Sequence, residues 1–85
     1  MANVSIFQGV VACMFYADQK PPHFHAEHLG NEAKFDFDGN MIAGDIKSVS
    51  MENIIKRWAK SRRKELIENW HRVIDLKPLK KIPPI

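Results

Sequence analysis

The chain has 85 residues, 45% hydrophobic and 27% charged. This composition is typical of one small soluble globular domain and excludes a disordered or fibrous protein. No apolar run approaches the roughly 20 residues that cross a bilayer, and "MANVSIFQG" lacks the basic region and cleavage pattern of a signal peptide. Because Cys13 is the only cysteine, no internal disulfide can form, and we expect a cytoplasmic protein.

The net charge of +3 is unevenly distributed along the chain. Residues 1–46 carry two basic and six acidic residues, a net charge of −4, whereas residues 47–85 carry eleven basic and four acidic residues, a net charge of +7. Such an asymmetry indicates either a surface for an acidic partner, protein or nucleic acid, or a well-solvated helix.

Four stretches of the N-terminal half predict strands. Residues 10–16 form a continuous apolar run, and residues 23–29 and 32–38 alternate between apolar and polar side chains. The fourth stretch, residues 41–46, follows a tight turn at Gly39-Asn40. We therefore predict an antiparallel β-meander of three to four strands with one apolar face.

The C-terminal half changes to a helical period. Apolar residues recur about every 3.6 positions from Ser50, a plausible N-cap, to about Asp75, which predicts one long helix. Arg62 interrupts the apolar stripe, so a bend or break near Ser61 is the alternative.

The whole chain is predicted to be a single α+β domain over residues 1–85, with the helix packed on the apolar face of the sheet. It comprises a sheet region (1–46), a helical region (47–76) and a basic, proline-rich tail (77–85). The tail either packs Leu79 and Ile82 on the sheet or hangs free.

The stretch "KPPHFHAEH" (Lys20–His28) holds three of the four histidines. A hairpin turning at Gly30-Asn31 would pair the apolar residues and set His25 opposite Asp36 and His23 opposite Asp38. His23, His25, Asp36 and Asp38 are therefore candidate catalytic residues, because a histidine held by a carboxylate can transfer protons near neutral pH. The alternative to a catalytic role is a solvated sheet face on which the histidines and aspartates only form hydrogen bonds, worth under about 1 kcal/mol each.

The same side chains are candidate metal ligands. His23, His25 and Asp36 offer imidazole and carboxylate groups, which suit a divalent metal such as zinc.

The motif "PPHFHAE", the flanking "GNEAKFDFDGNMIAG", and "W...R..EL.ENW" with the closing "PLKKI.P" resemble a bacterial family, domain-of-unknown-function family 4160. The resemblance runs from about Phe7 to Pro84, and His28 stands where members often have tyrosine. It brings no established activity. It does imply a small protein partner, because some members are encoded beside a second small protein, which suggests toxin–antitoxin-like pairs.

A basic surface is predicted on the helix face opposite the apolar stripe. Its candidate phosphate-binding residues are Lys56, Arg57, Lys60, Arg63 and Lys64.

Three functions stay open at this point. We favour an interaction module that binds a partner protein through the sheet face, a sheet edge or the tail. A metal-dependent or acid–base hydrolase of nuclease type, using the His-Phe-His face, is the first alternative, so enzymatic activity is undecided. Nucleic-acid binding through the basic helix is the second, and a homo-oligomer is compatible with all three.

Overall fold

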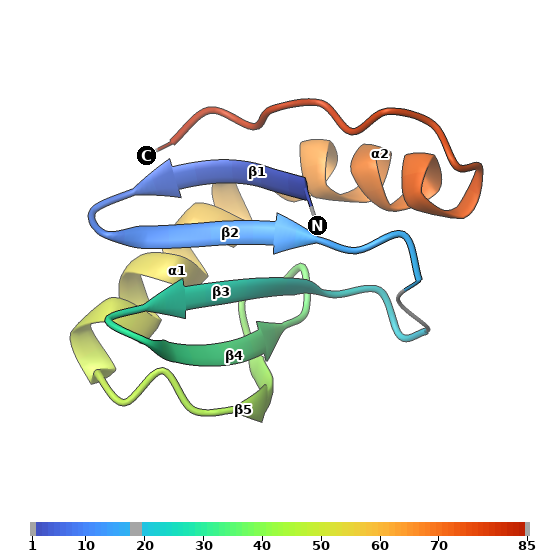
Figure 1. The fold of residues 1–85 in the computed structure, drawn as a ribbon. Helices are drawn as coiled ribbons and strands as arrows, with labels where there is room; N and C mark the ends of the chain where they lie inside the picture. The colour runs from blue at the N-terminus through green and yellow to red at the C-terminus, as the bar shows by residue number, and fades with distance from the viewer. Residues whose placement is uncertain (1, 18–19, 85) are drawn as a thin grey trace.

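The computed structural model describes residues 2–17 and 20–84. Its strands and helices are β1 (Ala2–Phe7), β2 (Val10–Met14), β3 (Phe24–His28), β4 (Asn31–Phe35), β5 (Met41–Gly44), α1 (Val49–Ser61) and α2 (Arg63–Ile74). The strands form one antiparallel sheet in chain order. Both helices lie on the same face of this sheet (Figure 1). The α+β class and the meander are confirmed, but the described sheet has five strands and not three to four.

β1 is the strand that the prediction omitted. It pairs with β2, and its register shifts between Asn3 and Ser5. Val4, in this irregular segment, is fully buried, as is Val10 on β2, and Phe7 is nearly so. Because the bulge breaks the strict alternation of apolar and polar residues, the strand pattern is hidden in the sequence.

The hairpin of β3 and β4 turns one residue earlier than predicted, which shifts the partners on β4 by two residues. The turn residues are Leu29 and Gly30, both with positive φ (51° and 80°), and Phe24 pairs with Phe35. The predicted pairing of Phe24 with Phe37 is therefore wrong. A shift of two residues leaves every side chain on its predicted face, because side chains alternate with a period of two.

The core lies between the sheet and the helices. Trp58 of α1 is fully buried, stacks on Phe7 with ring centroids 4.9 Å apart, and meets Phe24 edge-on at 5.4 Å. On α2, Leu66, Trp70 and Val73 are buried in the same cluster. The apolar stripe of the sequence thus marks the side of the helices that faces the sheet.

The helical region is two helices and not one. Ser48, and not Ser50, caps α1, because its Oγ accepts a hydrogen bond from the Met51 N–H at 3.2 Å. At Arg62 the backbone leaves helical geometry (φ −115°, ψ 19°), which fulfils the alternative of a break near Ser61. Because of this break, the Arg62 guanidinium does not lie in the apolar stripe. The guanidinium donates a hydrogen bond to the Pro84 carbonyl at 3.0 Å.

Residues 77–84, here called the tail, pack against the domain. The tail passes along α2 and β1 (Figure 1). The Ile82 N–H donates to the Val4 carbonyl at 2.7 Å, and the Ile82 side chain is buried. The Trp58 indole donates to the Pro83 carbonyl at 3.0 Å, so the tail is fixed to both β1 and α1.

Candidate functional site

The two histidines of the "HFH" motif are buried, contrary to the solvated face considered above. His23 is 4% exposed and His25 is 7% exposed. The His23 ring lies 5.6 Å from the Trp70 ring and 5.2 Å from the His25 ring, measured between centroids. Its Nδ1 is 2.7 Å from the Pro21 carbonyl oxygen. Since a carbonyl only accepts hydrogen bonds, Nδ1 carries a proton, and the proline pair sets the tautomer of His23.

His25 sits on the sheet face that the helices leave uncovered. Phe15 covers it edge-on, with ring centroids 4.4 Å apart at 88°. Its neighbours across the strands are Cys13 on β2 and Lys34 on β4. Glu32, also on β4, places its Oε1 3.3 Å from His25 Nδ1. His25 is therefore packed between an aromatic ring, a thiol and a carboxylate.

The structure does not bring the two aspartates to the histidines. His25 lies opposite Lys34 and not opposite Asp36, so the predicted His25–Asp36 and His23–Asp38 pairs are wrong. Asp36 lies in the turn after β4, where it accepts hydrogen bonds from the backbone N–H groups of Asp38 and Asn40 at 3.0 and 2.9 Å. Asp38 forms an ion pair with Arg63, with Oδ1 and Nε 3.1 Å apart.

The environment of Asp36 shifts its pKa. Partial burial acts to raise the pKa, but hydrogen bonds from the backbone and side chain of Asn40, and then from the N–H groups of Asp38 and Gly39, outweigh burial and lower it. Asp36 is thus ionised, and its carboxylate accepts hydrogen bonds within its own turn.

No three His, Cys, Asp or Glu side chains within residues 2–17 and 20–84 are arranged so that they could hold a metal ion. The proposed zinc ligands His23, His25 and Asp36 therefore do not form a ready-made centre in that part of the chain, and binding of a divalent metal stays a prediction.

The sequence analysis missed two polar neighbours of His25. Cys13 lies on the uncovered face directly opposite His25. Glu32 lies on β4, within 3.3 Å of His25 Nδ1, whereas the predicted register places it beside the turn. Correct pairing of the two hairpins would have found both, since residue parity already puts Cys13 and His25 on the face opposite the core.

The predicted basic surface is divided between the two helices. Lys56 and Arg63 reach the turn at residues 36–40, where the Lys56 Nζ lies 3.4 Å from Asn40 Oδ1 and Arg63 pairs with Asp38. Arg57, Lys60 and Lys64 are exposed and make no ion pair with any residue that the structure describes. Of the five predicted residues of the basic surface, these three therefore remain available to an outside anion as far as the described residues show.

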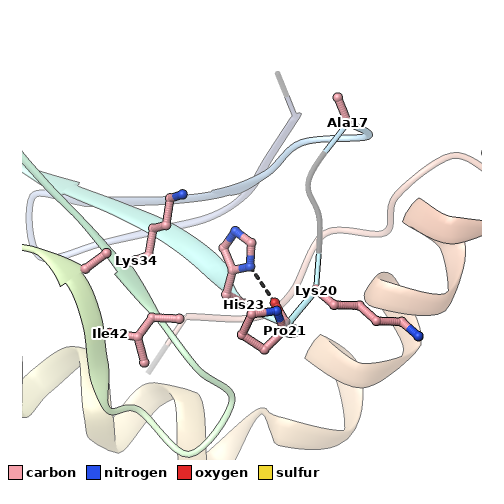
Figure 2. Close-up of a pocket in the computed structure, with 7 residues that line it drawn as sticks. Ala17, Lys20, Pro21, His23, Lys34 and Ile42 are labelled. Atoms are coloured by element: carbon pink, nitrogen blue, oxygen red, sulfur yellow. Dashed lines mark hydrogen bonds between the residues drawn. The ribbon is translucent and has the colours of Figure 1, made fainter.

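A hollow of about 560 Å³ opens beside His23, at the margin formed by β4 and β5. It is lined by Ala17, Lys20, Pro21, His23, Lys34, Ile42 and Ala43. In Figure 2 the Lys34 side chain lies beside the imidazole, whereas the Lys20 ammonium points away from it. Lys34 and Ala43 are partners in the β4–β5 ladder, so the hollow lies directly over the last two strands.

The two edges of the sheet differ in their cover. At β1, the tail donates the Ile82 hydrogen bond to Val4, and Lys81 Nζ donates to the Asn3 carbonyl at 2.6 Å. At β5, no strand or tail segment of the described residues pairs with the outer side, and Ile42, Ala43 and Gly44 are exposed. Backbone groups on an open edge can pair with a further strand.

These features define a small α+β protein with a five-stranded antiparallel sheet. The tail covers the β1 edge of this sheet, the β5 edge is open, and two buried histidines lie beside the hollow over β4 and β5. The chain belongs to the family described as Domain of unknown function (DUF4160), whose model matches residues 9–71. The matched range contains the histidines, β5 and most of both helices. No curated protein and no solved structure shows significant similarity to the chain. No helix of the described residues is long and apolar enough to cross a membrane.

Proposed function

We propose that this protein is an interaction module that binds a partner protein by adding one of the partner's strands to the outer edge of β5. The asymmetry between the two edges carries this proposal. The chain uses its own tail to cover β1, yet leaves β5 open. β1 is covered by the chain itself, whereas β5 is limited only by its length of four residues and by the register shift against β4.

The side chains of β5 suit such an addition. Ala43 and Gly44 are small, so another backbone can approach the strand closely. Ile42 is 44% exposed, which is high for a large aliphatic residue, and it also lines the hollow beside His23. An added strand would gain main-chain hydrogen bonds from the edge and an apolar contact from Ile42.

The resemblance noted for the sequence adds an expectation about the partner. In toxin–antitoxin-like pairs the second component is itself a small protein, and a single docked strand is a contact that fits a partner of that size. Which member of such a pair this chain would be does not affect the site.

The experiment compares two variants that make the same chemical change at different places. A tagged protein is recovered from its native cells as wild type, as Ile42→Lys on β5 and as Ile74→Lys on α2, where the isoleucine is 58% exposed. A charge on the edge disfavours strand addition. We therefore expect the Ile42→Lys variant to lose a stoichiometric protein partner that wild type and Ile74→Lys retain. Retention by the Ile42→Lys variant, with unchanged melting temperatures, would rule out the β5 edge.

One observation favours a second candidate function, nucleophilic hydrolysis. Cys13 lies opposite His25, whose Nδ1 is 3.3 Å from Glu32, so thiol, imidazole and carboxylate groups are neighbours. The hollow over them has a volume of about 70 Å³. If His25 activates the thiol, His25→Asn will slow alkylation of Cys13 by iodoacetamide in the native protein. Equal alkylation rates in wild type and variant would remove this candidate.

A further inference from the structure

The outer face of the last two strands has a specific charge pattern. Lys34 on β4 lies opposite Ala43 on β5, and the Ala43 side chain ends at Cβ. Lys34 is exposed and forms no ion pair with a carboxylate of the described residues. Glu32 lies two residues away on the same face and contacts His25. Along β4, therefore, an anion is followed by a cation at a spacing of two residues.

A strand added to β5 would place its own side chains in line with this pattern. Neighbouring strands are about 4.8 Å apart, so a partner residue opposite Ala43 would have its Cα roughly 10 Å from that of Lys34. Because Ala43 is short, it does not fill the space between them. A flexible lysine stem and a glutamate or aspartate side chain together span this distance across the strand.

The hollow of about 560 Å³ beside His23 has positively charged residues in its lining, which would suit an acidic side chain of the partner strand. Lys20 and Lys34 are among its lining residues, and within residues 2–17 and 20–84 no acidic residue lines it. Lys34 and Ala43 also line a second hollow of about 200 Å³, which extends toward Glu32. The first hollow thus attracts a negative group, and the second is less favourable for one.

We infer that the partner strand carries an acidic residue opposite Ala43, which pairs with Lys34, and a neutral or basic residue two positions away, beyond Gly44, where Glu32 and the exposed Asp45 lie level with each other. This inference rests on the proposed docking at β5 and specifies the partner's sequence there. The ligand is an extended segment of another protein with a single carboxylate at a defined register.

A second copy of this chain is a poorer occupant of the same edge. Pairing of β5 with β5 of a second copy around Ala43 would place two Lys34 ammonium groups on the same face of the joined sheet. Like charges oppose such pairing, and lysines near an open edge are a common device against self-association. The charge at Lys34 therefore favours a different, acidic partner over the chain itself.

The test uses the partner recovered with the full-length protein, purified and titrated against four variants. Lys34→Glu reverses the charge, and Lys34→Met removes it while keeping most of the stem. Lys77→Glu, at the start of the tail, is the matched control for the charge change because Lys77 is also exposed, and Ile42→Lys blocks the edge. We expect Lys34→Glu to weaken binding at least tenfold, Lys34→Met to weaken it less, and Lys77→Glu to leave it within twofold. In the partner, replacing the acidic residue by lysine should restore the affinity of the Lys34→Glu variant.

The outcomes separate this inference from the proposed function. If Ile42→Lys abolishes binding while Lys34→Glu binds like wild type, the β5 site stands and the acidic register is overturned. If Ile42→Lys binds like wild type, both are overturned. Recovery of nucleic acid alone, or of no partner at all, also overturns both. Melting temperatures of the four variants, expected within a few degrees of wild type, show that the losses are not caused by unfolding.

Discussion

The Asn69 side chain forms hydrogen bonds with both main-chain groups of Lys80, the N–H and the carbonyl. The Asn69 Nδ2 donates to the Lys80 carbonyl at 2.8 Å, and the Asn69 Oδ1 accepts from the Lys80 N–H at 3.0 Å. Asn69 is 1% exposed, so one buried amide on α2 takes the place of a neighbouring strand for this part of the tail. The Asn69–Lys80 pair and the Trp58–Pro83 hydrogen bond together fix the tail to the helices.

Replacing Asn69 by alanine should loosen the tail. The substitution removes two hydrogen bonds and leaves the Lys80 N–H and carbonyl without their buried partner, a loss of about 2–3 kcal/mol in the free energy of unfolding. Urea denaturation measures this value, and limited proteolysis should cut the tail faster. Asn53→Ala on the exposed side of α1 is the control and should change stability by under about 0.5 kcal/mol. Similar stabilities for the two variants would contradict the role of Asn69.

Two glycines with similar backbone angles should respond differently to alanine. Gly30 (φ 80°) has open space where a Cβ would lie, whereas a Cβ on Gly39 (φ 85°) would come within 2.6 Å of the Lys56 Cα. Gly30→Ala should cost only the left-handed conformation, about 1–2 kcal/mol. Gly39→Ala should cost clearly more, because the turn at residues 36–40 must also move away from α1. Thermal or urea unfolding of both variants tests this, and equal losses would exclude the contact as the cause.

The fold should lose part of its stability in acid through Asp36. Because its folded pKa lies below the ordinary value of 3.8, the ionised group stabilises the fold above that value, and this contribution is lost as the pH falls through the lower, folded pKa. Wild type should therefore exceed Asp36→Asn in stability at pH 6 by under about 1 kcal/mol, since the carboxylate is largely solvated. Chemical denaturation from pH 6 down to pH 2.5 should show the difference shrinking below about pH 3.8. A difference that stays constant would contradict the assignment.

The histidines of the motif should contribute to stability whether or not they have a further role. His23 and His25 are buried and contact Trp70 and Phe15, respectively. Alanine at either position should cost about 1–3 kcal/mol in the free energy of unfolding. His71→Ala, at an exposed position on α2, is the matched control and should have little effect. Wild-type stability of the His23→Ala and His25→Ala variants would restore the interpretation of a solvated face.

The three unpaired helix cations allow a quantitative test of nucleic-acid binding. Arg57, Lys60 and Lys64 should give weak, sequence-independent binding to duplex DNA at low salt. Each contact to a phosphate contributes about 0.9 to the slope of log K against log salt concentration. Replacing all three by alanine should therefore reduce the slope by up to about 2.7. A slope that is unchanged in the triple variant would remove this surface from consideration.

Much of the fold could be predicted from local patterns. The apolar stripes and the turn residues were sufficient for the α+β class, the meander and the faces of β3 and β4. The bulge at β1 hides its alternation, and the β3–β4 register depends on Leu29, a residue that seldom adopts positive φ. The bulge appears only when β1 pairs with β2, and the turn needs an uncommon backbone conformation at the exposed Leu29, so neither feature follows from the apolar pattern.

The candidate site depended on that register more than the fold did. A shift of two residues preserves the faces but exchanges the neighbours, so Lys34 replaced Asp36 opposite His25. The burial of the histidines also could not be predicted, because Phe15 and Trp70 cover them from separate parts of the chain. A prediction of faces is therefore robust to such a shift, whereas a prediction of contacts is not.

The tail along β1 also affects whether sheets of neighbouring molecules can join. Without residues 77–84, each molecule would present two open edges, and β1 of one molecule could join β5 of the next. Such a head-to-tail contact uses two different surfaces and repeats without closing, which produces fibres and not dimers. With residues 77–84 along β1, the proposed docking leaves β5 as the one edge of the described residues that would accept a strand. Under that proposal each molecule would take a single partner strand and would end a sheet without extending it.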